Sequence, residues 1–250
     1  MDIGSISIWL FVIVLTAISL GALVKGMTGL GLPLIAVPAI ASFTSVEEAV
    51  VLMIIPVIGS NLWMVGRQRR FAPLLVEHWP FLLAAFIGGI LGTFLLVAID
   101  DRWLKLILAM WLALYLLQLV LGDALSFVFR AKGAASALIG LAAGTIHGAS
   151  GISAHIVAPY FHGRQIAPAA YTFLVAVAFL TSSSAQFVTA LGNQLFDAER
   201  LTLGLLALIP TLIFTQVGMR CAGMISAATF RKIILVLFIL MEVKLIADVV

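Results

Sequence analysis

Long apolar runs alternate with short polar connections along the whole chain. An α-helix needs about 20 predominantly apolar residues to cross a bilayer. Eight runs approach or reach that length: Ile6–Val24, Val46–Val65, Trp79–Ala98, Trp103–Leu121, Gly133–Ile146, Ala167–Ala190, Leu201–Gly218 and Phe230–Ala247. The pattern predicts an all-α polytopic membrane protein that forms a single membrane domain over residues 1–250.

Composition excludes a soluble domain. The chain is 63% hydrophobic and 10% charged, with a mean hydropathy of +1.22, which is too apolar to supply the surface of a soluble protein. Its N-terminus lacks the positive region of a cleavable signal, so we interpret the first run as a retained helix. Positive charge beside membrane helices normally reports orientation, and we expect no nucleic-acid binding. The single cysteine, Cys221, excludes an internal disulfide and a cysteine-based metal site, and we expect no metal or cofactor.

Two shorter apolar pieces, Gly31–Phe43 and Ile152–Phe161, cannot span a bilayer as helices at about 1.5 Å per residue. Each follows a glycine-rich stretch, "KGMTGLGLPLIAVP" from Lys25 and "HGASGISAHIVAPY" from His147. We therefore predict a broken or re-entrant helix at each stretch, with the two breaks meeting near the membrane centre. Ser45 and Glu48 have the spacing of a capping box that opens the helix after the first piece.

The two stretches are related by a shift of 122 residues, which superposes Lys25 on His147 and Gly29 on Gly151. The same shift pairs Gly26 with Gly148, Thr28 with Ser150, Gly31 with Ser153, Ser60 with Ser182 and Asn61 with Ser183. This ordered series predicts an internal duplication, with repeats at about residues 1–125 and 126–250.

The basic residues distinguish two topologies. If each repeat crosses four times, seven basic residues fall on each side, which indicates no orientation. If the short pieces cross too, four residues share one side (Arg102, Lys105, Arg200 and Lys244) and ten share the cytoplasmic side (Lys25, Arg67, Arg69, Arg70, Arg130, Lys132, Arg164, Arg220, Arg231 and Lys232). We favour the second topology, in which five crossings make the repeats inverted, an arrangement that supports alternating access.

An interrupted helix exposes unpaired backbone N–H groups at the start of its second half, and these groups attract anions. Glycine suits such a place because it permits a positive φ and a close approach of the ligand. The alternative is that the glycines only allow tight helix packing, which we expect for "GGILG" at Gly88–Gly92.

The candidate substrate-binding residues lie at the two breaks and on the helix after each break. Lys25 could neutralise an anion, and His147 or His155 could donate to it or exchange a coupling proton. The whole set is Lys25, Gly26, Thr28, Gly29, Gly31, Ser60, Asn61, His147, Gly148, Ser150, Gly151, Ser153, His155, Ser182, Ser183 and Gln186. Each polar residue could instead bridge neighbouring helices.

Two other classes of function compete with transport. Gly148–Gly151 fits the GxSG pattern of rhomboid-type intramembrane proteases, with Ser150 as the nucleophile. A serine nucleophile needs a base within hydrogen-bond reach, and no histidine follows His162 to supply one from a later helix. We therefore expect no enzyme. A non-transporting membrane scaffold is the remaining alternative, although it would not need paired polar breaks.

The motif "KGMTGLGLPLIAVP", its degenerate copy in the second half, and the basic loop after the next helix resemble the TauE/SafE sulfite exporter family, also called the TSUP permeases. The resemblance covers essentially the whole chain. It implies a multi-pass protein of the inner (cytoplasmic) membrane that moves sulfite, sulfonates or related organic anions. The expected partners are therefore a small anionic substrate and the lipid bilayer, with a coupling proton left open.

Overall fold

The computed structural model describes residues 8–121, 132–164, 166–222, 224 and 227–248. These residues form helices and no strand, which confirms the predicted all-α fold. The helices are α1 (Ile8–Thr28), α2 (Leu32–Ala41), α3 (Val46–Arg67), the 3-10 helix η1 (Arg69–Leu74), α4 (Leu75–Ala98), α5 (Asp101–Leu121), α6 (Ala134–Ser150), α7 (Ala154–His162), α8 (Pro168–Gly192), α9 (Ala198–Cys221) and α10 (Ala227–Ala247).

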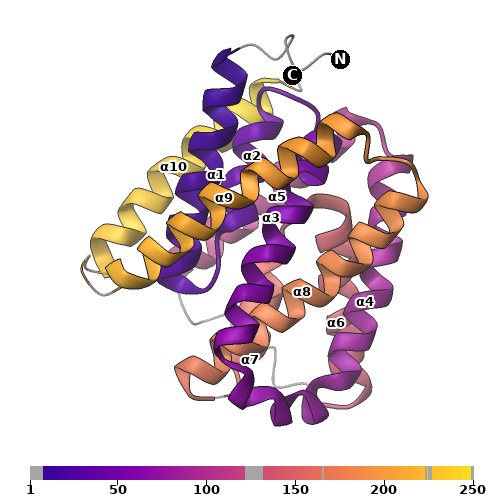
Figure 1. Cartoon of the computed structure of the whole chain (residues 1–250), viewed down its shortest axis with the longest axis vertical. Helices are drawn as coiled ribbons and strands as arrows, with labels where there is room; N and C mark the ends of the chain where they lie inside the picture. Colours follow the sequence, from indigo (N-terminus) through magenta and orange to yellow (C-terminus); the bar gives the residue numbers. More distant parts are fainter. Residues whose placement is uncertain (1–7, 122–131, 165, 223, 225–226, 249–250) are drawn as a thin grey trace.

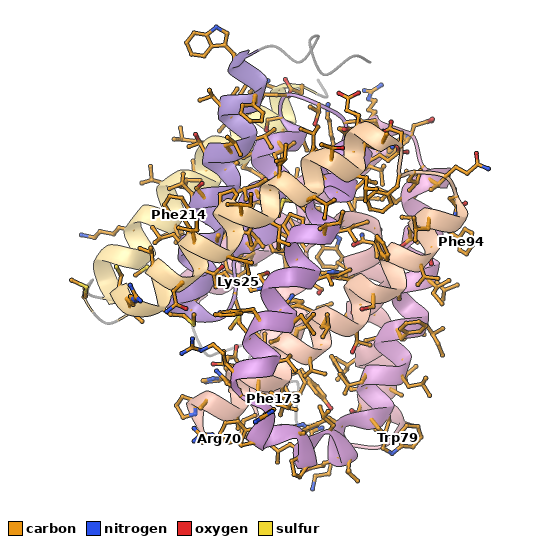
Figure 2. All side chains as sticks on the ribbon, viewed as in Figure 1. Lys25, Arg70, Trp79, Phe94, Phe173 and Phe214 are labelled. Carbon is orange, nitrogen blue, oxygen red and sulfur yellow. The ribbon has the colours of Figure 1, made fainter. Side chains whose placement is uncertain are left out.

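Five segments among the described residues are long and apolar enough to cross a membrane. They are Phe11–Thr28, Val46–Arg67, Arg69–Ala98, Pro168–Gly192 and Ala198–Cys221. Large apolar side chains such as Trp79 and Phe94 are 59% and 51% exposed and project from the bundle, whereas Lys25 lies among the helices (Figure 2). A surface of this kind is stable when lipid covers it, which fits a multi-pass membrane protein.

Both predicted breaks are present. Helix α1 ends at Thr28 and α2 begins at Leu32, with Gly29 at φ 81° and Gly31 at φ 121° between them. Helix α6 ends at Ser150 and α7 begins at Ala154, with Gly151 at φ 70°. These positive φ values explain the glycines, because other residues rarely adopt them.

Each short helix folds back along the helix that precedes it. A Cβ on Gly21, in the middle of α1, would lie 2.6 Å from the backbone oxygen of Leu32, at the start of α2. At the other break, the Tyr160 hydroxyl near the end of α7 hydrogen-bonds to Ser136, in the first turn of α6. The chain therefore leaves each hairpin on the side where it entered.

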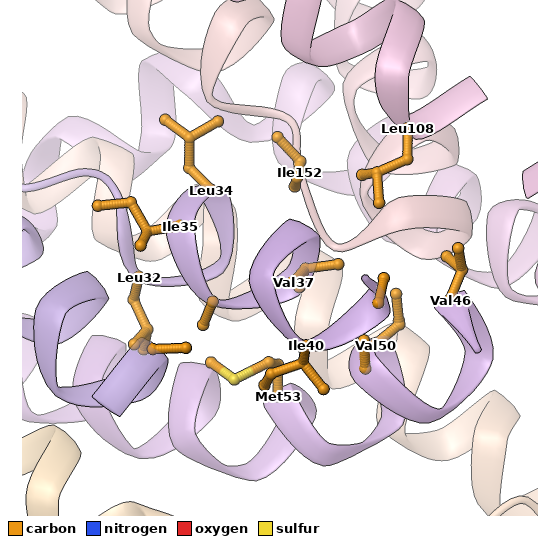
Figure 3. Packing of buried hydrophobic residues seen from close by; sticks show 14 of the residues in the cluster. Leu32, Leu34, Ile35, Val37, Ile40, Val46, Val50, Met53, Leu108 and Ile152 are labelled. Atoms are coloured by element: carbon orange, nitrogen blue, oxygen red, sulfur yellow. The ribbon is translucent and has the colours of Figure 1, made fainter. Parts of the chain in front are cut away.

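Helix α2 is buried inside the bundle. Its side chains Leu32, Ile35 and Ile40 pack with Met53 of α3, and Ile152 from the second break joins the same apolar cluster (Figure 3). Backbone that is not part of a full-length helix is tolerated at membrane depth only where protein or water surrounds it. The packing around α2 meets that requirement and brings the two breaks together.

Polar contacts define two ends of the bundle. At the first, here called the Asp101 end, the carboxylate of Asp101 accepts a 2.7 Å hydrogen bond from the Val46 backbone, and Arg200 pairs with Glu48 at 2.6 Å. The predicted cap is also here: Ser45 accepts a hydrogen bond from the Glu48 backbone. At the second, the Arg164 end, Arg164 pairs with Glu77 at 3.3 Å. Helix α1 begins and helix α10 ends at the top of Figure 1, where α9, which carries Arg200, also begins.

The two halves of the chain run in opposite directions. Helix α1 enters from the Asp101 end and α6 from the Arg164 end, while α3 and α8 lie antiparallel against each other (Figure 1). Helices follow one another in the same order in both halves, namely long, short and then three long helices. This order is consistent with an inverted duplication, which stays a prediction.

Labelling of introduced cysteines tests this topology. In a Cys221→Ser background, we expect Arg69→Cys and Arg220→Cys to react with an impermeant maleimide from one side of the membrane, and Arg102→Cys to react from the other. One membrane-spanning helix, α4, separates Arg69 from Arg102, so the two residues should lie on opposite sides of the membrane. Labelling of Arg69→Cys and Arg220→Cys from opposite sides would contradict the inverted arrangement.

Candidate functional site

Lys25 is the centre of the candidate site. It sits in the last turn of α1 and is only 2% exposed. Its ammonium nitrogen donates to Asn61 Oδ1 at 2.6 Å and to Ser60 Oγ at 2.9 Å, both on α3. Within the described part of the chain no carboxylate pairs with it, so a buried lysine is held by neutral acceptors alone. An ammonium group has three donors, and one is left for a ligand.

Asn61 supplies a second free donor. Because Lys25 can only donate, the side-chain oxygen of Asn61 must face it and the amide nitrogen must point elsewhere. That nitrogen, Asn61 Nδ2, is buried and has no hydrogen-bond partner among the described residues. A buried donor without a partner is costly, so this N–H group is suited to an acceptor that enters from outside the protein.

A small cavity connects these donors with both breaks. Its volume is about 10 Å³, and its polar or glycine lining consists of Lys25, Gly29, Gly31, Asn61 and Ser153. A space of this size holds about one water molecule. The first break contributes both glycines, while the second contributes Ser153, so residues more than one hundred positions apart share the cavity. A larger anion would enter only after the surrounding helices separate.

His147 occupies the corresponding place in the second half. Its Nε2 lies 2.8 Å from Ser183 Oγ, and its Nδ1 lies 3.2 Å from Ser153 Oγ. The shift of 122 residues that superposes Lys25 on His147 also superposes Asn61 on Ser183. Both aligned pairs are hydrogen-bonded in the structure, which supports the duplication. Ser153 links His147 to the cavity.

The hydroxyls of Thr28 and Ser150 close the breaks locally. The single hydrogen of the Thr28 hydroxyl is shared between the Val24 and Leu30 carbonyls, at 2.9 and 2.7 Å, and the hydroxyl oxygen accepts from the Leu30 backbone at 3.1 Å. Ser150 makes the corresponding contacts with Ile146 and Ile152. The two hydroxyls therefore satisfy free backbone groups where the helices end. They hold the shape of each break, and neither residue lines the central cavity.

Gly26 and Gly148 lie at close helix contacts. A Cβ on Gly26 would collide with the Thr215 backbone of α9, and one on Gly148 with the Gly89 backbone of α4. The same is true of Gly88, whose Cβ would collide with the Leu141 backbone of α6, as expected for a packing glycine. Tight packing, rather than access for a ligand, explains all three of these glycines.

Three further candidates lie outside the cavity. The ring of His155 stacks on Trp111 at 4.5 Å between centroids. Gln186 Nε2 donates to the backbone oxygens of His147 and Gly148, which ties α8 to α6. Ser182 is buried, and its backbone packs against Gly89 of α4.

Two aromatic residues that the sequence analysis missed contact the candidate histidines. Phe179 lines the cavity and stacks on His147, while Trp111 stacks on His155. Phe179 precedes Ser183 by four residues, which places both on one face of α8. That spacing was the available signal for Phe179. Trp111 lies on α5, and nothing in the sequence connects it with the second break.

The structure does not assemble a serine hydrolase. Both ring nitrogens of His147 are engaged by Ser153 and Ser183, and the Ser150 hydroxyl hydrogen-bonds to the backbone of Ile146 and Ile152. His155 stacks on Trp111. No group of residues suited to a metal ion occurs among the described residues.

A bundle of membrane-length helices, broken twice around a buried polar cavity, has the architecture of many secondary transporters. The family model "Sulfite exporter TauE/SafE" matches residues 13–245, so the chain belongs to the sulfite exporter TauE/SafE family. This match confirms the resemblance seen in the sequence. No curated protein and no solved structure matches the chain. Because the family is one of transporters, it is consistent with the expectation that the protein is not an enzyme.

Proposed function

We propose that this protein moves a small sulfur oxyanion, such as sulfite or an organic sulfonate, across the inner membrane by alternating access. The observation that carries the proposal is the buried ammonium of Lys25, which neutral Ser60 and Asn61 hold beside a cavity shared by both breaks. A buried charge without a counter-ion is unfavourable, and an anionic substrate would supply that counter-ion.

The donors around the cavity suit an oxyanion. Lys25 and Asn61 Nδ2 each offer an unused N–H, and Ser153 offers a hydroxyl. Helices α2 and α7 begin at the cavity, and the N-terminal end of a helix carries a partial positive charge. In an oxyanion the negative charge is shared by several oxygen atoms, and each of them can accept a hydrogen bond from one of these donors.

Alternating access is supported by the closure of both ends. Arg200 pairs with Glu47 and Glu48 at the Asp101 end, and Arg164 pairs with Glu77 at the other. Between them the cavity has room for about one water molecule. We interpret this as an occluded state, in which opening of either end would expose the cavity to one side of the membrane. By the positive-inside rule, the Arg164 end faces the cytoplasm.

We propose that His147 carries a coupling proton. Its ring links Ser153, which lines the cavity, to Ser183 deeper in α8. Imidazole can accept and release a proton near neutral pH.

Flux of labelled sulfite into liposomes that contain the purified protein tests the proposal. We expect saturable uptake that accelerates when the liposomes are preloaded with unlabelled sulfite, because a carrier that alternates between sides returns faster when it is loaded. A channel would show no such acceleration. Uptake equal to that of protein-free liposomes, for both sulfite and sulfonates, would overturn the proposal and favour a scaffold.

A further inference from the structure

A second polar cavity lies at the Arg164 end, away from the central site. Its volume is about 310 Å³, within the range of about 300–1,000 Å³ for small-molecule sites. The polar residues that line it are Glu77 and His78 of α4, Lys132 before α6, and Arg164 after α7. Three separate parts of the chain thus meet around it, at the end of α7 opposite to the end that borders the central cavity.

The charge of this cavity is positive. Arg164 and Lys132 are cationic, and Glu77 is the one carboxylate in the lining. Glu77 pairs with Arg164 at 3.3 Å, and Arg164 also donates to the Tyr160 hydroxyl at 2.7 Å. Lys132 is exposed, and no ion pair joins it to another described residue, so its charge faces the cavity without a described counter-ion.

His78 is the second observation that points to a ligand. It is only 2% exposed, and its ring packs edge-on against Phe161 at 5.3 Å. Its Nδ1 is buried and has no hydrogen-bond partner among the described residues. The structure places this buried polar ring, without a partner for that nitrogen, in the lining of a cationic cavity.

We propose that this cavity is a second oxyanion site, distinct from the central one. A sulfite-like or phosphate-like group is held there by Lys132, His78 and Arg164, with Glu77 keeping Arg164 in position. The group can come from a free oxyanion or from the phosphate of an anionic lipid headgroup, since both offer the same oxygen acceptors.

Equilibrium binding of labelled sulfite to the full-length protein, in nanodiscs of phosphatidylcholine, tests this site. We expect two sulfite ions bound per protein, and one in Lys25→Met, which removes the charge of the central site. His78→Phe keeps the ring packing but loses the nitrogens, and Lys132→Gln loses the charge. Each should weaken the second binding event at least tenfold, as expected for a lost charge-assisted bond. Arg69→Gln removes one charge from the same end of the bundle without touching the cavity, and should leave both events unchanged.

Nanodiscs that contain phosphatidylglycerol distinguish the two sources. Loss of the second sulfite-binding event in these nanodiscs, together with less lipid co-purifying with His78→Phe, would assign the site to a lipid headgroup. Persistence of both events would assign it to the free oxyanion. A second event that neither His78→Phe nor Lys132→Gln weakens, or its absence from the wild-type protein in phosphatidylcholine, would overturn the second site. Unchanged binding in Lys25→Met would instead contradict the central site.

Discussion

We expect Gly29→Val and Gly151→Val each to reduce sulfite flux to the level of protein-free liposomes. Valine is poorly tolerated at φ values of 81° and 70°, and the left-handed conformation alone costs about 1–2 kcal/mol for a residue with a Cβ. Space is also short, because the new Cβ would lie 3.3 Å from Thr172 Cγ2 at the first break and from Val37 Cγ2 at the second. Relief of this strain would turn the backbone of each break and displace the donors at the cavity.

The control must be a glycine that neither packs tightly nor adopts a positive φ. Gly88 does not qualify, because even an alanine there would collide with the backbone of α6. Gly66, in the last turn of α3, has nothing within 4 Å of a Cβ, so Gly66→Val should keep its flux. Expression level and detergent stability need to be measured for each variant, because a folding defect would also abolish flux. Wild-type rates in well-folded Gly29→Val and Gly151→Val proteins would show that the breaks are only turns.

Removing the charge of Lys25 is the second large effect. We expect Lys25→Met, which keeps the length and apolar stem of the side chain, to weaken sulfite binding about 10- to 150-fold. This range follows from about 1.5–3 kcal/mol for a charge-assisted hydrogen bond, at 1.4 kcal/mol per factor of ten. Binding isotherms and flux at a low sulfite concentration measure the loss.

Asn61→Asp separates a binding role of Lys25 from a structural one. The variant retains Lys25 but places a carboxylate where Asn61 Oδ1 now accepts its 2.6 Å hydrogen bond. If Lys25 is there to attract an anion, the new counter-ion should abolish flux while thermal stability is kept or increased. If the lysine only ties α1 to α3, Asn61→Asp should transport normally, and that result would contradict the proposed site.

The two breaks could be predicted from sequence because their cause is local. A glycine-rich stretch followed by an apolar piece too short to span the membrane indicates an interruption, and Gly29 and Gly151 adopt the positive φ that this requires. The internal shift of 122 residues also aligned Lys25 with His147 and Asn61 with Ser183, which form the same contacts in the two halves.

What sequence could not provide was the direction of each polar side chain. Thr28 and Ser150 were expected to face an anion, but each hydroxyl bonds to a carbonyl four residues earlier, the nearest acceptor on its own helix. Gly26 and Gly148 serve helix contacts whose partners lie far along the chain. The cavity around His78 was also missed, because Glu77 and Arg164 are 87 positions apart and no pattern connects them.

The contact between α1 and α9 has a consequence for how the protein is made. Gly26 packs against Thr215 and Gly218, so α1 has a close partner that is synthesised about 190 residues later. At about 5–20 residues per second, that delay is about 10–40 s. During this time α1 has to stay in the bilayer with Lys25 and the backbone at Gly29 still without their final surroundings. We therefore expect the central cavity to assemble late, after insertion. Until then, the polar groups of the α1–α2 hairpin need to be shielded from lipid by the insertion machinery.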